Sequence, residues 1–166
     1  MIYFIADTHF NHANIIKYCN RPFKNTDEMN KYIVKKWNSI VKETDTVYHL
    51  GDVGFGSFKE VKKLVGSLNG RKILLRGNHD FKIGISAWKE IGFLEVYKKK
   101  IILDNLLLTH APTEEVEENQ VNVFGHIHDK PIDKKFDKKN HVCVSCDVVD
   151  YIPVSISKIK SIDKQL

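Results

Sequence analysis

Gly77-Asn78-His79-Asp80 follows a short apolar run, residues 71–76 (RKILLR), that is typical of a buried strand. The four residues therefore present an amide, an imidazole and a carboxylate together at the carboxyl end of that strand. Open α/β sheets bind their ligands at this edge, so we expect a functional site here. Other polar groups in the chain occupy the same position relative to their own strands.

Four further strand-like runs end in side chains that are able to bind a metal ion. These side chains are Asp7 and His9 after residues 2–6, Asp52 after residues 46–50, His110 after residues 106–108, and His126 and His128 after residues 121–124. Imidazole, carboxylate and amide groups without a thiolate are typical of a site for a borderline to hard divalent ion. The groups outnumber the ligands of one four-coordinate ion, which favours two ions that share a bridging carboxylate, roughly 3.5–4 Å apart.

The order of strand-like and helix-like segments predicts an α/β fold with two sheets and flanking helices, in one domain over residues 1–166. The expected helices cover residues 11–20, 28–42, 58–68 and 86–91, with Thr26 or Asp27 capping the second. The second half is richer in strands, because residues 101–103 and 106–108 predict an antiparallel hairpin and residues 141–149 and 153–156 predict late strands before a last short helix.

Composition narrows the class of protein further. The 166 residues are 42% hydrophobic, as in globular proteins. No apolar run is long enough to span a bilayer, and residues 1–7 (MIYFIAD) resemble a core strand more than a signal peptide. We therefore expect a cytoplasmic protein without a membrane partner. The three cysteines form no disulfide framework, and Cys143 and Cys146 lack the second pair that a zinc site needs, so buried free thiols are favoured.

Charge leaves the choice of partner open. The net charge of +5 arises from 26 basic and 21 acidic residues, and most of the excess is lysine in short clusters. A solvated, lysine-rich surface is the simpler interpretation, and attraction of nucleic acid is the alternative. The sequence does not indicate an oligomeric state.

Five motifs, taken together and in this order, resemble the calcineurin-like metallophosphoesterases. They are Asp7-Thr8-His9, Gly51-Asp52, Gly77-Asn78-His79-Asp80, Thr109-His110 and Gly125-His126-Ile127-His128. Residues 7–16 and 20–23 also resemble a small bacterial and phage-associated branch of predicted phosphoesterases. The resemblance implies a four-layer α/β/β/α sandwich with two mixed β-sheets.

The resemblance also implies a role for each motif residue. One ion would be bound by Asp7, His9 and His128, and a second by Asn78, His110 and His126, with Asp52 as the bridge. His79 would stabilise charge or protonate the leaving oxygen, and Asp80 would orient its ring. The implied activity is hydrolysis of a phosphodiester or phosphomonoester by direct attack of a metal-bound hydroxide. Manganese is the expected ion, and iron, cobalt, nickel and zinc also suit these ligands.

Four residues outside the motifs receive separate interpretations. We expect His12 and Arg21 to bind substrate, with a surface position or a helix-end contact as the alternatives. We expect Asp147 to orient a ligand histidine and His49 to be a hydrogen-bonded core residue. Two other functions remain open: a nuclease acting on nucleic acid, and a non-catalytic metal-binding scaffold of the same fold. The scaffold would be expected to have lost His79 or the ligands, and here all are present.

Overall fold

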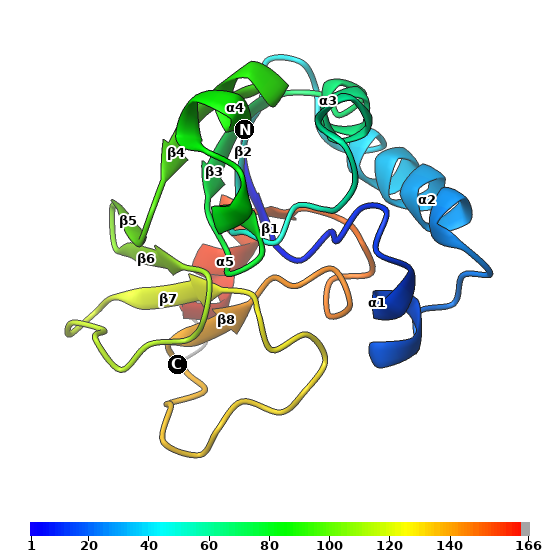
Figure 1. Ribbon diagram of the computed structural model, residues 1–166. Helices are drawn as coiled ribbons and strands as arrows, with labels where there is room; N and C mark the ends of the chain where they lie inside the picture. Colours follow the sequence, from blue (N-terminus) through cyan, green and yellow to red (C-terminus); the bar gives the residue numbers. More distant parts are fainter. Residues whose placement is uncertain (164–166) are drawn as a thin grey trace.

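The computed structural model describes residues 1–163 as two β-sheets with helices (Figure 1). The helices of this part of the chain are α1 (Ala13–Tyr18), α2 (Thr26–Asn38), α3 (Phe58–Gly66), α4 (Ile85–Ile91) and α5 (Ile156–Asp163), with a 3₁₀ turn at Asp80–Lys82. The strands are β1 (Ile2–Ile5), β2 (Thr46–His49), β3 (Arg71–Leu75), β4 (Phe93–Tyr97), β5 (Lys100–Leu103), β6 (Leu106–Thr109), β7 (Val121–Phe124), β8 (His141–Cys143) and β9 (Val154–Ser155). None of the helices described is long and apolar enough to cross a membrane.

Both sheets are mixed, which confirms the predicted fold class. The larger sheet has the order β4-β3-β2-β1-β9, with only β9 antiparallel to its neighbour, and the smaller has the order β5-β6-β7-β8. The expected hairpin is present, because β5 and β6 pair antiparallel, with Leu103 opposite Leu106. Ile5 pairs with His49 and His49 pairs with Leu74, so β1, β2 and β3 end in line. The loops that follow these three strands therefore meet at one edge.

Two apolar cores lie on opposite faces of the larger sheet. Trp37 of α2 and Trp88 of α4, both fully buried, pack with Ile5 in the core beneath the helices. Phe4 packs with Leu108 of the smaller sheet in the core between the sheets. Because Phe4 and Ile5 are neighbours on one strand, the alternation of side chains sends them to different faces. Figure 1 shows α2, α3 and α4 on the face of the larger sheet that is turned away from β7 and β8.

Several element boundaries differ from the expected ones. Helix α2 begins one residue after Asn25, whose side chain accepts the backbone N–H of Glu28 at 2.9 Å, so neither Thr26 nor Asp27 is the cap. The late strand ends at Cys143 rather than at residue 149. Beyond it, Ser145 forms an isolated bridge with Ala6, which joins the end of the smaller sheet to the end of β1. This junction brings the loops of both sheets to the same edge.

Candidate metal centre

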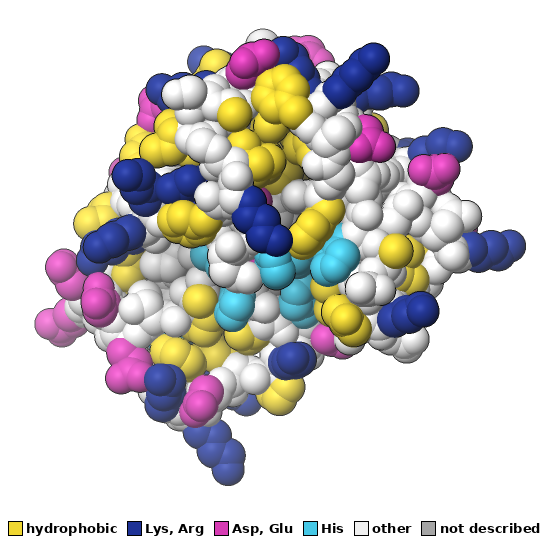
Figure 2. Space-filling model, in the orientation of Figure 1, with side chains coloured by type: hydrophobic (Ala, Val, Ile, Leu, Met, Phe, Trp, Pro, Cys, Tyr) yellow, Lys and Arg dark blue, Asp and Glu magenta, His cyan; other side chains and the backbone are white. Residues whose placement is uncertain are grey.

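The expected metal ligands come together at the edge where the strands of both sheets end. Figure 2 shows histidine side chains gathered near the middle of one face, with hydrophobic side chains beside them. Within the described residues, three groups of three side chains have ligand atoms that all lie within 4.8 Å of one another, and two of these groups consist of expected metal ligands, whereas the third is Cys19, His128 and Asp147. The first group is Asp7, His9 and His128, and the second group is Asp52, His110 and His126.

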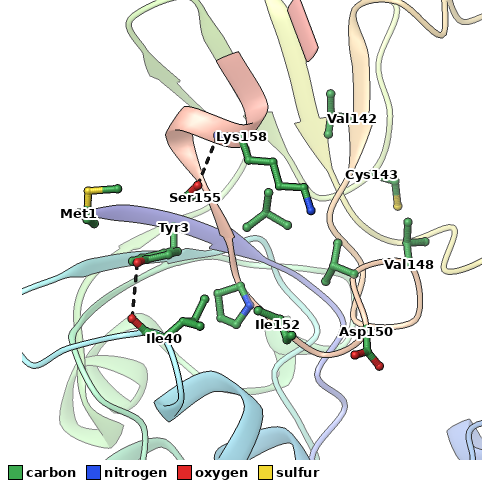
Figure 3. A pocket seen from close by; sticks show the side chains of 13 residues that line it. Met1, Tyr3, Ile40, Val142, Cys143, Val148, Asp150, Ile152, Ser155 and Lys158 are labelled. Atoms are coloured by element: carbon green, nitrogen blue, oxygen red, sulfur yellow. Dashed lines mark hydrogen bonds between the residues drawn. The ribbon is translucent and has the colours of Figure 1, made fainter. Parts of the chain in front are cut away.

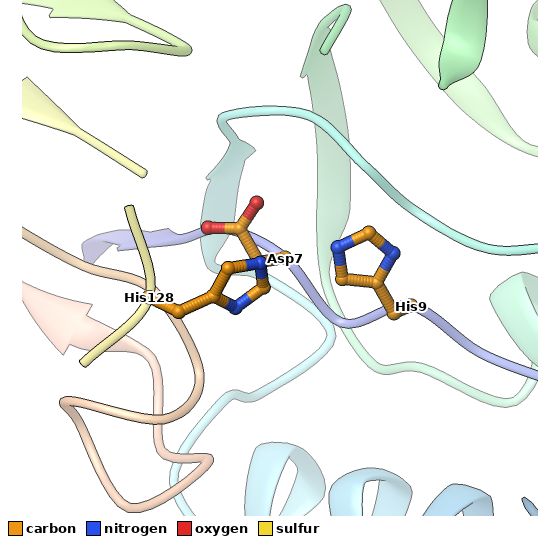
Figure 4. Close-up of side chains that lie close together, drawn as sticks. All are labelled: Asp7, His9 and His128. Carbon is orange, nitrogen blue, oxygen red and sulfur yellow. The ribbon is translucent and has the colours of Figure 1, made fainter. Parts of the chain in front are cut away.

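The first group is almost closed to solvent and has unsatisfied ligand atoms. Asp7 is 0% exposed and His9 is 2% exposed, and Figure 4 shows their side chains close to that of His128. The Oδ2 atom of Asp7 accepts hydrogen bonds from Ser145 Oγ at 2.6 Å and from the backbone N–H of His126 at 2.8 Å. The Oδ1 atom of Asp7 and both ring nitrogens of His9 are buried and have no hydrogen-bond partner. Buried polar atoms are rarely left unpaired, so a bound cation fits this group.

The protonation of the first group supports the same conclusion. Burial lowers the pKa of His9 to about 2, so its ring is neutral at pH 7 and offers a lone pair. Burial raises the pKa of Asp7, although the nearby rings of His110 and His128 oppose that effect. A buried carboxylate that is costly to ionise gains from a neighbouring cation, because the cation favours its charged form.

The second group is more open and contacts a fourth expected ligand. The Nε2 atom of His110 lies 3.0 Å from Asn78 Oδ1 and 3.2 Å from His126 Nδ1. The other ring nitrogen of His110, Nδ1, donates to the carbonyl oxygen of Leu50 at 2.8 Å, which directs Nε2 toward the group. Burial lowers the pKa of His110, but the carboxylates of Asp52 and Asp7 outweigh burial and raise it to about 9. Asn78 and His126 are both exposed.

Asp52, a member of the second group, also faces the first group. Its Oδ2 atom is 3.7 Å from His9 Nε2 and 3.5 Å from His110 Nε2, so one oxygen faces a ring of each group. Its Oδ1 atom accepts the backbone N–H of His79 at 3.0 Å. Burial raises the pKa of Asp52, but His110 reverses this and lowers it to about 2, so the carboxylate is charged at pH 7. This position suits a ligand shared by two ions.

His79 belongs to neither group, and Asp80 does not orient it. The side chain of His79 is 39% exposed, and its Nε2 atom lies 3.9 Å from Asp52 Oδ2. The Asp80 carboxylate instead accepts three backbone N–H groups, those of Gly77 at 2.8 Å, Asp52 at 2.7 Å and Val53 at 3.0 Å. Asp80 opens the 3₁₀ turn and is 1% exposed, so its side chain points into the protein. The expectation that it orients the His79 ring is therefore wrong, and Asp80 holds the two loops together.

Arg21 also differs from its expected role. It is 4% exposed, and its guanidinium donates from Nε to Asp147 Oδ1 at 2.8 Å and from Nη2 to Asp147 Oδ2 at 3.0 Å. Nη2 also donates to the carbonyl oxygen of Asp7 at 2.8 Å, and Nη1 donates to that of Thr8 at 3.1 Å. With its donors directed at the protein, Arg21 has none facing a substrate. The expected contact of Asp147 is present, because its Oδ2 atom lies 2.7 Å from His128 Nδ1.

The backbone at the ligands is strained. Positive φ angles, which L side chains rarely adopt, occur at five of the seven expected ligands: Asp7, His9, Asp52, His126 and His128. Such positions each cost about 1–2 kcal/mol and persist where the surrounding structure holds them. Gly77 allows the loops to approach closely, since a Cβ atom there would overlap the Asp52 carboxylate and the His110 ring. Sequence pattern does not reveal this crowding, although Asp, Asn and His are, apart from glycine, the residues that tolerate a positive φ best.

A cavity of about 560 Å³ opens onto the metal-ligand groups. It is lined by His79 and His12, which is half-buried, and by Tyr18 and Lys130, which the sequence analysis did not single out. His12 therefore lies beside the expected ligands, in the same cavity. Phe55 packs against His12 with 4.2 Å between ring centroids. Tyr18 and Phe55 lack a motif that could have identified them, because their role depends on where the loops fold.

A second cavity, of about 610 Å³, lies away from the ligands (Figure 3). Its wall is formed mainly by apolar side chains such as Ile40, Val148 and Pro153, with Lys158 and Asp150 at its polar part. It contains no group of histidines and carboxylates of the kind found in the first cavity. The metal-ligand groups therefore make the smaller cavity the candidate active site.

The chain is similar to a known protein family and to several individual proteins. The family model for calcineurin-like phosphoesterases matches residues 1–144. The uncharacterized protein MJ1445 of Methanocaldococcus jannaschii is 40% identical, covering 98% of this chain and 92% of that protein. The crystal structure of AQ665 from Aquifex aeolicus, a protein of unknown function, has a TM-score of 0.71 at 28% identity and covers 100% of this chain and 99% of that one. Nuclease MPE from Pseudomonas putida has a TM-score of 0.54 at 18% identity, covers 76% of this chain and 60% of that one, and is alike in fold alone.

Proposed function

The chain belongs to the calcineurin-like phosphoesterase family, and we propose that it is a dinuclear metal-dependent phosphoesterase that hydrolyses a phosphodiester or a phosphomonoester. The observation that carries this proposal is the position of Asp52 Oδ2, between a ring nitrogen of each ligand group. Asp7, His9 and His128 would hold one ion, and the more open second group would hold the other with Asn78. Manganese is the first ion to test, because oxygen and imidazole ligands accept several divalent metals and availability decides among them.

The bound ions would supply a Lewis acid for the phosphoryl oxygens and a water of lowered pKa as nucleophile. The chain's own residues would orient the ester and manage the proton. His79 lies beside Asp52 without belonging to either ligand group, and its exposed ring faces the cavity. Its Nε2 atom would hold the proton that the leaving oxygen takes up, a role that contributes about 10²–10⁴-fold in rate.

A nuclease is the second candidate, and one observation favours it. Lys130 lines the cavity at the start of the lysine-rich loop of residues 129–140, so positive charge lies next to the expected reaction centre. The likeness to nuclease MPE supports the fold and adds no substrate. A nuclease would bind less tightly as salt increases, because it releases counterions from its nucleic acid. A non-catalytic scaffold has less support, because His79 and all seven expected ligands are present.

The proposed function is tested with bis(p-nitrophenyl) phosphate and purified protein loaded with Mn²⁺. We expect Asp52→Asn and His79→Ala each to lower kcat/KM by about 10²-fold or more, since each removes a group that acts at the reacting atoms. Asp150→Asn is the matched control, because that carboxylate is 67% exposed and lies outside the cavity. Melting curves show whether the variants are folded. Equal turnover by wild type, Asp52→Asn and His79→Ala would refute the proposed function.

A further inference from the structure

Four aromatic rings form a wall beside the cavity, those of Phe55, His9, His12 and His79, and the three histidine rings line the cavity. The ring of Phe55 lies 4.2 Å from that of His12 and 5.2 Å from that of His79, centroid to centroid. His12 is the centre of this wall, because its ring also lies 5.4 Å from that of the ligand His9. The wall therefore starts at the metal ligands and runs outward.

Tyr18 stands at the outer end of this wall. It is the last residue of α1, lines the same cavity, and has its ring centroid 6.5 Å from that of His12. It is 73% exposed, the highest fraction among the large hydrophobic side chains that the structure describes. No hydrogen bond of its hydroxyl is recorded within the described residues. An exposed aromatic side chain at a cavity rim offers a π face on which a ligand can stack.

We propose that Tyr18 and His12 form a subsite for a nucleobase, so that the ester hydrolysed at the ligand groups is a nucleotidyl ester. This inference rests on the proposed function, since the base would be linked through its sugar to the phosphate at the ligands. Aromatic side chains stack on any base, because every base has a π face, and such stacking requires no sequence-specific hydrogen bond. The ring of His12 lies 5.4 Å from that of the ligand His9 and 6.5 Å from that of Tyr18, so a base held by His12 and Tyr18 would lie next to the phosphate at the ligands.

Stacking predicts a specific loss of affinity in one variant. The probes are an adenosine 5′-phosphonate, which has no cleavable ester bond, and the matching ribose phosphonate without a base. Binding of each to the manganese-loaded protein is measured by titration calorimetry. The wild type should bind the adenosine probe about 5- to 100-fold more tightly than the ribose probe, the range expected for one stacked base. Tyr18→Ala should remove that difference and leave the affinity for the ribose probe unchanged.

Two further variants separate stacking from other causes. Tyr18→Phe keeps the ring and removes the hydroxyl, so it should retain the preference for adenosine. Tyr97→Ala removes another exposed tyrosine, 37% exposed on β4 and outside the cavity, and should behave as the wild type. The inference is overturned if Tyr18→Ala keeps the adenosine preference, or if it weakens both probes equally.

The outcomes also distinguish this inference from the proposed function. A protein that hydrolyses bis(p-nitrophenyl) phosphate without preferring adenosine retains its function and lacks the subsite. A protein that prefers adenosine in a Tyr18-dependent way and hydrolyses no ester has the subsite and lacks the function.

A third probe, a short oligo(dA) strand, identifies the source of the base. A strand end is indicated if the oligo(dA) strand binds more tightly than the adenosine probe and its affinity falls with salt. The expected slope is about 0.7 log units of affinity per contacted phosphate for each log unit of salt. Binding no tighter than the adenosine probe indicates a small nucleotide. Either result supports the subsite.

Discussion

The two ligand groups stand side by side but are built differently. In the first, Asp7 and His9 are buried, and His128 is held by the carboxylate of Asp147 at 2.7 Å. In the second, His126 and Asn78 are exposed, and their recorded side-chain contacts are with neighbouring ligand side chains. Side chains outside the ligand set thus hold Asp7 and His128 of the first group. In the second group only His110 and Asp52 are held from outside, by backbone groups of Leu50 and His79.

This difference indicates how the two proposed ions should behave. A ligand that is already held in place loses less freedom when it binds, so a supported group binds its ion more tightly than an unsupported one. We therefore expect the first group to retain its ion at low metal concentration and the second group to lose it. The support behind the first group, which consists of Arg21 and Asp147, is the feature to disturb.

The largest expected effect on stability comes from removing the guanidinium of Arg21. Arg21→Met keeps much of the volume and leaves the buried Asp147 carboxylate without the guanidinium, in contact with the His128 ring alone. Breaking a buried ion pair by removing one member costs about 3–5 kcal/mol, because the remaining charge is uncompensated. We expect the free energy of unfolding of the metal-free protein, measured in urea, to fall by that amount.

Lys36→Met is the matched control for this measurement. Lys36 also pairs with an aspartate, Asp150 at 2.7 Å, and lies over a tyrosine ring, 5.3 Å from the centroid of Tyr32. Its partner is solvent-exposed, so water replaces the lost contact and the stability should stay near that of the wild type. Equal losses in the two variants would contradict a special role for Arg21.

A smaller and more local effect is expected from Asp147→Asn. The amide has the shape of the carboxylate but binds the Nδ1–H group of His128 less strongly, so the ring is held and polarised less well. Loss of such an outer contact weakens metal binding by about 10- to 100-fold. We expect the tighter of two manganese-binding steps to weaken by that factor and the weaker step to stay unchanged, as measured by competition with a chromophoric chelator. Asp150→Asn should change neither step, and equal weakening of both steps by Asp147→Asn would remove the proposed difference between the groups.

The ligands themselves could be predicted from the sequence, and their support could not. Asp7, Asp52 and Asn78 each follow an apolar run, and parallel strands in register bring such positions to one edge. Arg21 shows no such regularity, because its partner Asp147 is 126 residues away and only the closure of the two sheets brings them together. A lone arginine beside the ligand motifs suggested a phosphate contact, whereas burial and four oxygen acceptors give it a structural role.

Asp80 was misinterpreted for a related reason. Its place next to His79 suggested a contact within the turn, but backbone N–H groups of two loops converge on it instead. Loop N–H groups that lack a partner in a helix or sheet come together only in the folded chain. Sequence pattern therefore cannot reveal which side chain they will donate to. The positions of ligands that follow apolar strands could be predicted, and the contacts made by the loop backbone could not.

The smallest expected effect concerns a histidine that supports both groups equally. His49 is 1% exposed, and its Nδ1 atom accepts the backbone N–H of Gly51 at 3.2 Å. The hydroxyl of Thr8 donates to the carbonyl oxygen of Val53 at 2.7 Å, so the Nε2–H group of His49 must be the donor to Thr8 Oγ1, 2.9 Å away. The neutral ring thus links the loop of Asp7 to the loop of Asp52, as the expected core histidine.

Protonation of His49 would break this link, which gives stability a pH dependence of known sign. Burial lowers the pKa of His49 to about 3, below its ordinary value of 6.5, so between these values the unfolded chain binds the extra proton. Stability is then fully present above pH 6.5 and is lost as pH falls toward 3. Between pH 7.5 and pH 5.5 we expect His49 to account for a loss of about 1.4 kcal/mol in the free energy of unfolding.

His49→Gln isolates this contribution, because glutamine offers an acceptor and a donor and does not titrate. Urea unfolding of the metal-free wild type and variant at pH 7.5, 6.5 and 5.5 should give curves of stability against pH that diverge, with the wild type falling more steeply. Other histidines titrate in both proteins and cancel in the difference. Parallel curves would show that His49 does not set the pH dependence.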